Sequence, residues 1–100
     1  MTEAATGSGS HRIEGDLTCD EVPAVWARHR SWKESGIPEV IDLSGVGLAD
    51  SSGVALLLEW LAWARRQQRP LRFDNAPDSL RTIASLSQVD GLLGWEETEQ

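Results

Sequence analysis

The residues best suited to chemistry stand at positions 50–53, where the sequence reads Asp50, Ser51, Ser52 and Gly53. They follow a β-branched stretch and precede an apolar one, an order that predicts a strand, a tight turn and a helix start. We expect Ser51 and Ser52 to cap the helix, because their hydroxyls can accept hydrogen bonds from its free backbone amides. A phosphate on Ser51 would also be tolerated there by the positive end of the helix dipole. Positions 50–53 are therefore the predicted partner-binding site, with Ser51 as the candidate phosphoacceptor.

The two histidines and the single cysteine give no support to a hydrolase or to a metal centre. A hydrolase nucleophile elbow orders its triad as serine, acid and histidine along the chain, whereas His11 and His29 both precede Ser51. His11, His29 and Cys19 are the soft metal-ligand candidates, and none shows the paired spacing of zinc sites. The sequence therefore predicts no catalytic residue, no enzyme activity and no metal site, with His29 as a partly buried packing residue.

Gly45 and Gly47 lie between the strand and the helix, as the first glycines of a dinucleotide-binding loop do. The third glycine of that pattern would fall at Asp50, where a carboxylate would repel a pyrophosphate. We therefore interpret the two glycines as a source of loop flexibility and predict no cofactor.

The helix that follows the turn has apolar residues on two faces. One face, which we expect to lie against the sheet, holds Val54, Leu57, Leu58, Leu61 and Ala64. A second stripe at helical spacing holds Leu56, Trp60, Trp63 and Gln67. Either the two tryptophans pack sideways on the first or third helix, against Trp26 or Trp32, or with Leu56 they form a partner-binding surface. A helix that is apolar nearly all round is covered on more than one side.

Strands and helices alternate along the sequence, which predicts an α/β domain. Asp20 and Asn75 are candidate caps for the first and third helices. Alternation with short loops implies parallel strand pairs joined by right-handed crossovers, with helices packed mainly on one face of a small sheet. The predicted elements, in order, are a weak edge strand around Arg12–Glu14, a helix from Asp20 to Trp32, a strand at Glu39–Leu43, a helix at about Ser52–Gln67, a strand at Leu71–Phe73 and a helix from Asn75.

Length, charge and cysteine content narrow the class of protein. One hundred residues make one domain, in which residues 1–9 are predicted to be a disordered lead, residues 10–95 the folded domain and residues 96–100 a frayed end. The net charge of −7 argues against nucleic acid and anionic lipid as direct partners. No signal peptide or membrane-spanning run is recognisable, and Cys19 cannot form an internal disulfide. We therefore expect a cytoplasmic protein without direct membrane insertion.

The segment from Ile41 to Leu58, which contains Asp50, Ser51 and Gly53, resembles the signature of STAS domains, the family of anti-sigma factor antagonists and sulfate-transporter tails. The likeness covers about residues 10–95 and is most specific in the Asp-Ser/Thr-x-Gly pattern. It implies a small sheet of about four strands, mostly parallel, with helices mainly on one face. Many STAS domains start with an extra edge strand, and residues 1–9 are a poor strand sequence.

Within the family, the chain is most similar to the MlaB-like branch, through its short length, Pro23-x-x-Trp26, Ala55–Leu58 and the helix end Ala64–Gln67. This likeness implies a non-catalytic cytoplasmic subunit, peripheral to the inner membrane, that docks on the MlaF-like ATPase of a phospholipid-transporting ABC complex with its permease. MlaB-like proteins commonly have threonine after the aspartate, whereas a serine, as at Ser51, is what anti-sigma factor antagonists present to their serine kinase. An anti-sigma factor antagonist phosphorylated at Ser51 is therefore the alternative.

Overall fold

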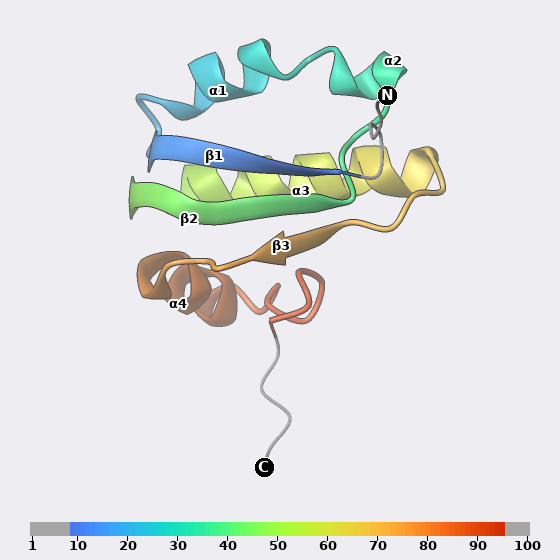
Figure 1. Cartoon of the computed structure of the whole chain (residues 1–100). Coiled ribbons are helices and arrows are strands. Elements are labelled where there is room, and N and C mark those ends of the chain that lie inside the picture. Colours follow the sequence, from blue (N-terminus) through green and yellow to red (C-terminus); the bar gives the residue numbers. More distant parts are fainter. Residues whose placement is uncertain (1–8, 96–100) are drawn as a thin grey trace.

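The computed structural model describes residues 9–95, which form one sheet with helices beside it (Figure 1). The strands are β1 (Ser10–Leu17), β2 (Val40–Ala49) and β3 (Arg72–Asp74). The helices are α1 (Val22–Arg28), α2 (Trp32–Ser35), α3 (Ser51–Arg66) and α4 (Asp78–Leu86). The alternation of strands and helices that the sequence predicts is confirmed.

The sheet has the order β1-β2-β3, and both neighbouring pairs are parallel. Its described part has three strands, not about four, although β1 and β2 are longer than their predicted cores. The register between β1 and β2 shifts twice, between Arg12 and Glu14 and between Gly15 and Leu17. Because all strands are parallel, their carboxyl ends meet at one edge, and the turn before α3 lies there (Figure 1).

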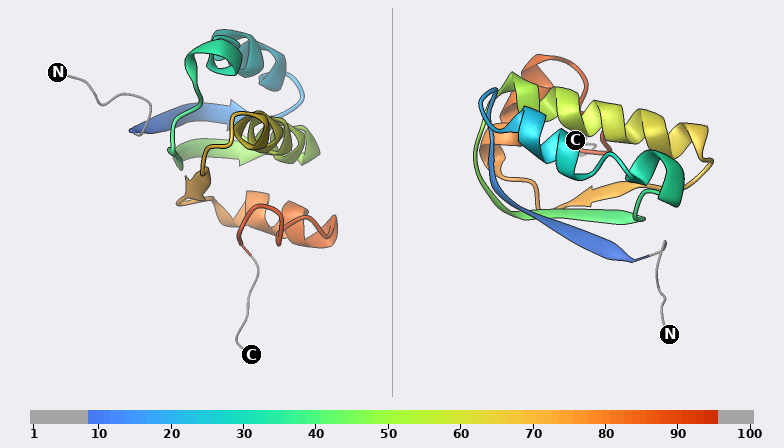
Figure 2. Two further views of the ribbon diagram at one scale, coloured as in Figure 1. Left: turned by 90° about the vertical axis from the view of Figure 1, so that its right-hand side faces the viewer. Right: turned by 90° about the horizontal axis from the view of Figure 1, so that it is seen from above.

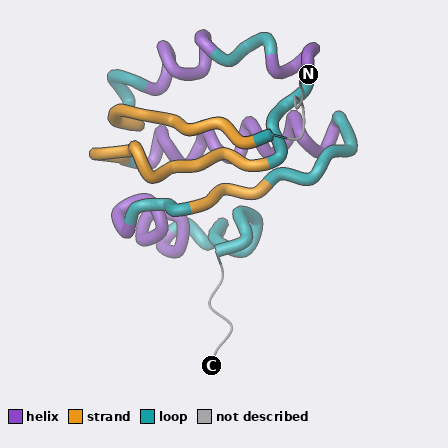
Figure 3. The backbone as a smooth tube through the Cα atoms, viewed as in Figure 1, coloured by secondary structure: helices purple, strands orange, loops and turns teal. Residues whose placement is uncertain are grey.

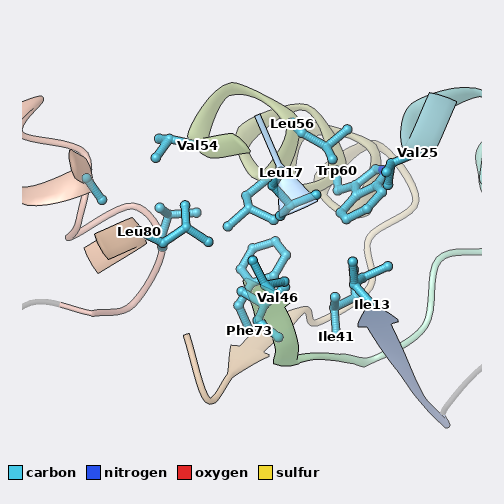
Figure 4. Packing of buried hydrophobic residues seen from close by; sticks show 14 of the residues in the cluster. Ile13, Leu17, Val25, Ile41, Val46, Val54, Leu56, Trp60, Phe73 and Leu80 are labelled. Atoms are coloured by element: carbon cyan, nitrogen blue, oxygen red, sulfur yellow. The ribbon is translucent and has the colours of Figure 1, made fainter. Parts of the chain in front are cut away.

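The helices lie on one side of the sheet, as the sequence predicts (Figure 2). Along β2, Ile41 and Leu43 are fully buried, whereas Asp42 and Ser44 are half-buried and exposed. This alternation places apolar side chains toward the helices and polar ones on the opposite face. Side chains from the sheet meet those of α3 in the core, where Trp60 is one of the largest buried residues (Figure 4).

The predicted first helix from Asp20 to Trp32 is two short helices, α1 and α2, separated by a loop (Figure 3). The break is at His29, whose ring Nδ1 lies 2.8 Å from the carbonyl oxygen of Val25. In a continuous α-helix that carbonyl would accept the backbone amide of His29. The amide of His29 instead bonds to the carbonyl of Trp26, so the side chain replaces the helical hydrogen bond and ends α1.

Two predicted helix caps are also corrected. Glu21, not Asp20, is the cap position of α1, and no side chain accepts a capping bond there. Pro77, not Asn75, is the cap position of α4. Asn75 has a left-handed backbone with φ of 60°, and its side-chain amide donates a 3.0 Å hydrogen bond to Asp42 on β2. Asn75 therefore joins the end of β3 to the neighbouring strand.

The predicted disordered lead and frayed end lie at residues 1–8 and 96–100, outside the described residues. The same holds for an additional edge strand before β1. Gly9, the last residue of the predicted lead, is described, and its carbonyl accepts hydrogen bonds from the amides of Glu39 and Val40. Within residues 9–95, no helix is both long enough and apolar enough to cross a membrane.

Candidate partner-binding site

The turn between β2 and α3 is held by the carboxylate of Asp50. Its Oδ1 accepts a 2.8 Å hydrogen bond from the amide of Ser52, and its Oδ2 accepts a 3.0 Å bond from the amide of Cys19. Asp50 has an extended backbone and occupies the cap position of α3. The prediction that Ser51 and Ser52 cap this helix is therefore wrong, because the preceding carboxylate takes that role.

The Asp50 carboxylate is ionised at neutral pH. The amide of Cys19 is the largest cause that lowers the pKa of Asp50, and the hydrogen bonds from Ser52 act in the same direction. The charge lies at the amino end of α3, where the helix dipole also favours an anion. Asp50 thus ties the end of β1, the end of β2 and the start of α3 together.

Gly53 allows α3 to approach the end of β1 closely. A Cβ atom at position 53 would lie 2.8 Å from the carbonyl oxygen of Leu17 and 3.0 Å from its Cβ. Gly47 meets a similar limit, since its Cβ would lie 2.8 Å from Oδ1 of Asp16. That same oxygen accepts a 2.9 Å hydrogen bond from the amide of Leu48. The glycines of this segment serve close packing rather than the loop flexibility that the sequence suggests.

The outer surface of the turn combines a hydroxyl with an apolar side chain. Ser51 is exposed in the first turn of α3, Leu48 is 69% exposed, and the thiol of Cys19 is exposed beside them in the fold. Sequence reasoning missed Leu48, because the predicted strand ended at Leu43 and left position 48 in a loop. The signal that was available is the apolar residue directly before Ala49 and Asp50. A hydroxyl, an apolar side chain and a thiol are therefore exposed around the residues that Asp50 holds.

The predicted partner surface at Leu56, Trp60 and Trp63 is corrected, because these residues are 3%, 0% and 1% exposed. The alternative, sideways packing, is confirmed. The ring of Trp60 lies 5.1 Å from that of Trp32, and the ring of Trp63 lies 6.2 Å from that of Trp26. Of the residues expected against the sheet, Val54, Leu57 and Ala64 are buried, whereas Leu58 and Leu61 are half-buried.

Gln67, at the end of the same stripe, has a role that its sequence position did not suggest. Its side-chain Oε1 accepts a 3.0 Å hydrogen bond from the amide of Ile37. Its Nε2 donates to the carbonyls of Trp32, at 2.8 Å, and Lys33, at 3.2 Å. The amide group of Gln67 therefore fixes α2 and the following loop to the end of α3.

The histidines lie away from this turn. His11 is near the start of β1, paired with Ile41, and His29 ends α1 beside it. Neither ring is brought to Ser51, which lies beyond the opposite end of β1 and β2. The arrangement at Ser51 therefore lacks the histidine base of a Ser-His-Asp triad among the described residues.

Comparisons with known proteins identify the family and the fold. The family model described as "Mlab, STAS domain" matches residues 2–94. Among solved structures, the fold is similar to that of a sulfate transporter family protein from Wolinella succinogenes, with a TM-score of 0.69 and 18% sequence identity. The likeness covers 93% of this chain and 76% of that chain, and at this identity it concerns the fold alone. The comparison with curated proteins gave no match.

Proposed function

The chain belongs to the MlaB-type family of STAS domains, and we propose that it is the non-catalytic subunit that binds and supports the ATPase of an Mla-type ABC transporter. Such a transporter moves phospholipid between the inner and outer membranes and maintains outer-membrane lipid asymmetry. STAS domains act through protein partners, and the observation that carries the proposal is the exposed Ser51 on a turn fixed by Asp50. We further propose a cytoplasmic location, peripheral to the inner membrane through the ATPase and its permease.

The geometry of the turn supports a protein contact. Both carboxylate oxygens of Asp50 are engaged by backbone amides, so the partner meets the hydroxyl of Ser51 and the apolar side chain of Leu48. A surface that is fixed before binding loses little conformational entropy when the partner docks. The net charge of −7 supports attachment through a protein rather than through anionic lipid.

The test is affinity purification of the full chain from its own cells, followed by mass spectrometry of the bound proteins. We expect an ABC ATPase together with its permease. Ser51→Glu and Leu48→Glu should each reduce the recovered ATPase about tenfold or more, because each buries a new charge in the contact.

Ser31→Glu is the matched control, since Ser31 is an exposed serine at the cap position of α2. It places the same charge at a helix start, on the helix that Gln67 fixes to the opposite end of α3, and should recover as much ATPase as the wild-type chain. Equal loss in the control and in Ser51→Glu would contradict the proposed contact surface. If the wild-type chain is recovered without any bound ATPase, the transporter role is contradicted.

A second candidate function is favoured by the exposure of Ser51 in the first turn of α3. There a phosphate would be tolerated by the helix dipole, and the double negative charge would change the surface that a partner meets. The chain would then be an anti-sigma factor antagonist controlled by a serine kinase. Co-purification of such a kinase, with phosphate on Ser51 and none in Ser51→Ala, would select this function over transport.

A further inference from the structure

The imidazole rings of His11 and His29 lie in contact between β1 and the end of α1. The Nε2 atoms of His11 and His29 lie 3.3 Å apart. The ring centroids are 5.0 Å apart and the ring planes are nearly perpendicular, at 79°. The two residues are 18 positions apart in the sequence, so the fold brings together a pair that sequence spacing did not suggest.

The tautomer of His29 is fixed by its own backbone. Its Nδ1 lies 2.8 Å from the carbonyl oxygen of Val25, a group that only accepts hydrogen bonds, so Nδ1 carries the proton. The lone pair of a neutral His29 is therefore on Nε2, the atom that faces His11. Metal-ligating histidines commonly donate their second ring N–H to a backbone carbonyl in this way. Burial is the main cause that lowers the pKa of His29, which favours the neutral ring.

The separation of the rings fits a shared metal ion. Two imidazole nitrogens bound at about 2.05 Å to one tetrahedral ion lie roughly 3.3 Å apart, with ring centres roughly 5.2 Å apart. A linear hydrogen bond of the same length would place the ring centres roughly 5.6 Å apart. The observed centroid separation of 5.0 Å is close to the value for two ligands of one ion, and it also lies within the range of an edge-to-face ring contact.

We propose that His11 and His29 bind one borderline transition-metal ion, such as Zn²⁺, through their Nε2 atoms. Binding requires His11 to carry its proton on Nδ1, a change of tautomer that releases no proton from the neutral pair. Imidazole is a preferred ligand of Zn²⁺, Cu²⁺ and Ni²⁺. This inference does not depend on the proposed transporter role.

The residues around the two histidines determine how tightly a metal ion would be held. A hollow of about 200 Å³ beside the rings is lined by Arg12, Glu14 and Arg28 as well as by the two histidines. Within residues 9–95, no cluster of three or more histidine, cysteine or acidic side chains forms a complete ligand set. Water therefore fills the remaining coordination positions of the ion. The positive charges of the two arginines repel a cation, and the negative charge of Glu14, which pairs with Arg12 at 3.4 Å, partly offsets that repulsion. These features predict an exchangeable ion, not a permanently held structural one.

The test is isothermal titration calorimetry of the full chain, purified without a histidine tag, with ZnCl₂ at pH 7.5. We expect binding of one ion per chain. His11→Ala should weaken it about tenfold or more, because one of two protein ligands is lost. The His11 side chain is exposed, so the variant should keep the far-ultraviolet circular dichroism of the wild-type chain.

Cys19→Ser is the control, because the exposed thiol is the other soft ligand within residues 9–95. It should bind zinc with unchanged affinity. A second readout is the ring signals of His11 and His29 in NMR spectra, both of which should shift on addition of zinc. The proposal is overturned if no zinc binds, if His11→Ala binds zinc with the affinity of the wild-type chain, or if binding disappears in Cys19→Ser.

Discussion

Helix α3 and the layer formed by α1 and α2 lie on the same side of the sheet but are held in different ways. Helix α3 has 16 residues, seven of them buried, and a carboxylate cap at its start. Helices α1 and α2 have seven and four residues, contribute a single buried residue, Val25, and have no side-chain cap. Short isolated helices are marginal in water, so α1 and α2 must obtain their stability from packing.

That packing comes from α3. The ring of Trp60 contacts the rings of Trp32 and His29, at centroid distances of 5.1 and 5.7 Å. Trp63 packs near Trp26, and Gln67 bonds to the backbone of α2. Helix α3 thus packs directly on the sheet, whereas the α1–α2 layer is attached to α3 by aromatic rings and by the side-chain amide of Gln67.

The largest expected effect is that of Trp60→Ala, which removes the ring on which the layer rests. We expect a loss of about 3–5 kcal/mol in the free energy of unfolding, typical of a buried aromatic residue. Amide hydrogen exchange should increase most in α1 and α2, because their packing partner is lost. Urea denaturation and exchange mass spectrometry measure the two effects.

Trp95→Ala is the control for that experiment. Trp95 is also buried, but it packs on Phe73 of β3, at a ring distance of 6.4 Å. It should reduce stability without a preferential increase in exchange at α1 and α2. The same exchange pattern in both variants would contradict a specific role of Trp60 in stabilising α1 and α2.

A smaller loss is expected for Gly53→Ala, which tests the contact between α3 and β1. The added methyl group would lie 2.8 Å from the carbonyl oxygen of Leu17, so the first turn of α3 must shift. We expect a loss of about 1–3 kcal/mol by urea denaturation. Gly91→Ala is the matched variant, because Gly91 is exposed and lacks a positive φ, and it should leave stability nearly unchanged.

Asp50→Asn should reduce stability in a way that depends on pH. The pKa of Asp50 is lowered in the folded chain, first by the amide of Cys19. Its contribution is therefore complete above the ordinary aspartate pKa and is lost as pH falls through the lowered value. The stability difference between wild type and variant should be constant near neutral pH and shrink below about pH 4.

Thermal unfolding across this pH range measures the difference, and Asp20→Asn controls for the loss of one negative charge. Asp20 is exposed in the turn that follows Cys19. A stability difference for Asp50→Asn that persists unchanged to pH 2.5, about one unit below the ordinary aspartate range, would contradict the role of the ionised carboxylate.

The smallest effect on stability is expected for Ser51→Ala, within about 0.5 kcal/mol, because an exposed side chain that is not the cap is removed. Ser51→Glu should also keep the fold, since the charge lies at the amino end of α3. Far-ultraviolet circular dichroism and thermal melts check both variants. Loss of structure in either would show that Ser51 supports the turn rather than a partner.

The sequence was sufficient for the order of the strands and helices, including the strand-to-helix junction that holds the candidate site. The strand before Asp50, the apolar helix after it and Pro70 beyond it are local patterns, and the structure places the corresponding elements there. The family signature lies in the same segment, where β2 leads into α3. Local patterns of this kind are read along the chain and need no knowledge of its three-dimensional contacts.

The features that sequence reasoning missed depend on side-chain contacts, most of them between distant residues. His29 ends α1 because its ring bonds to Val25, whereas its position alone fits a helical stripe. Trp60 and Trp63 are buried because α1 and α2 cover them, which helical spacing could not decide. Asp50 was assigned to the surface, yet its carboxylate reaches the amide of Cys19, 31 positions earlier.

The bond between Asp50 and Cys19 has a practical consequence for spectroscopy. Cys19 is the single cysteine of all 100 residues, and its thiol is exposed. The backbone amide of the same residue donates the hydrogen bond that holds the Asp50 turn. A fluorophore or spin label coupled to that thiol leaves the backbone amide free to keep its bond. The native chain thus carries its own labelling position beside the candidate site, so partner docking can be followed without engineering a cysteine.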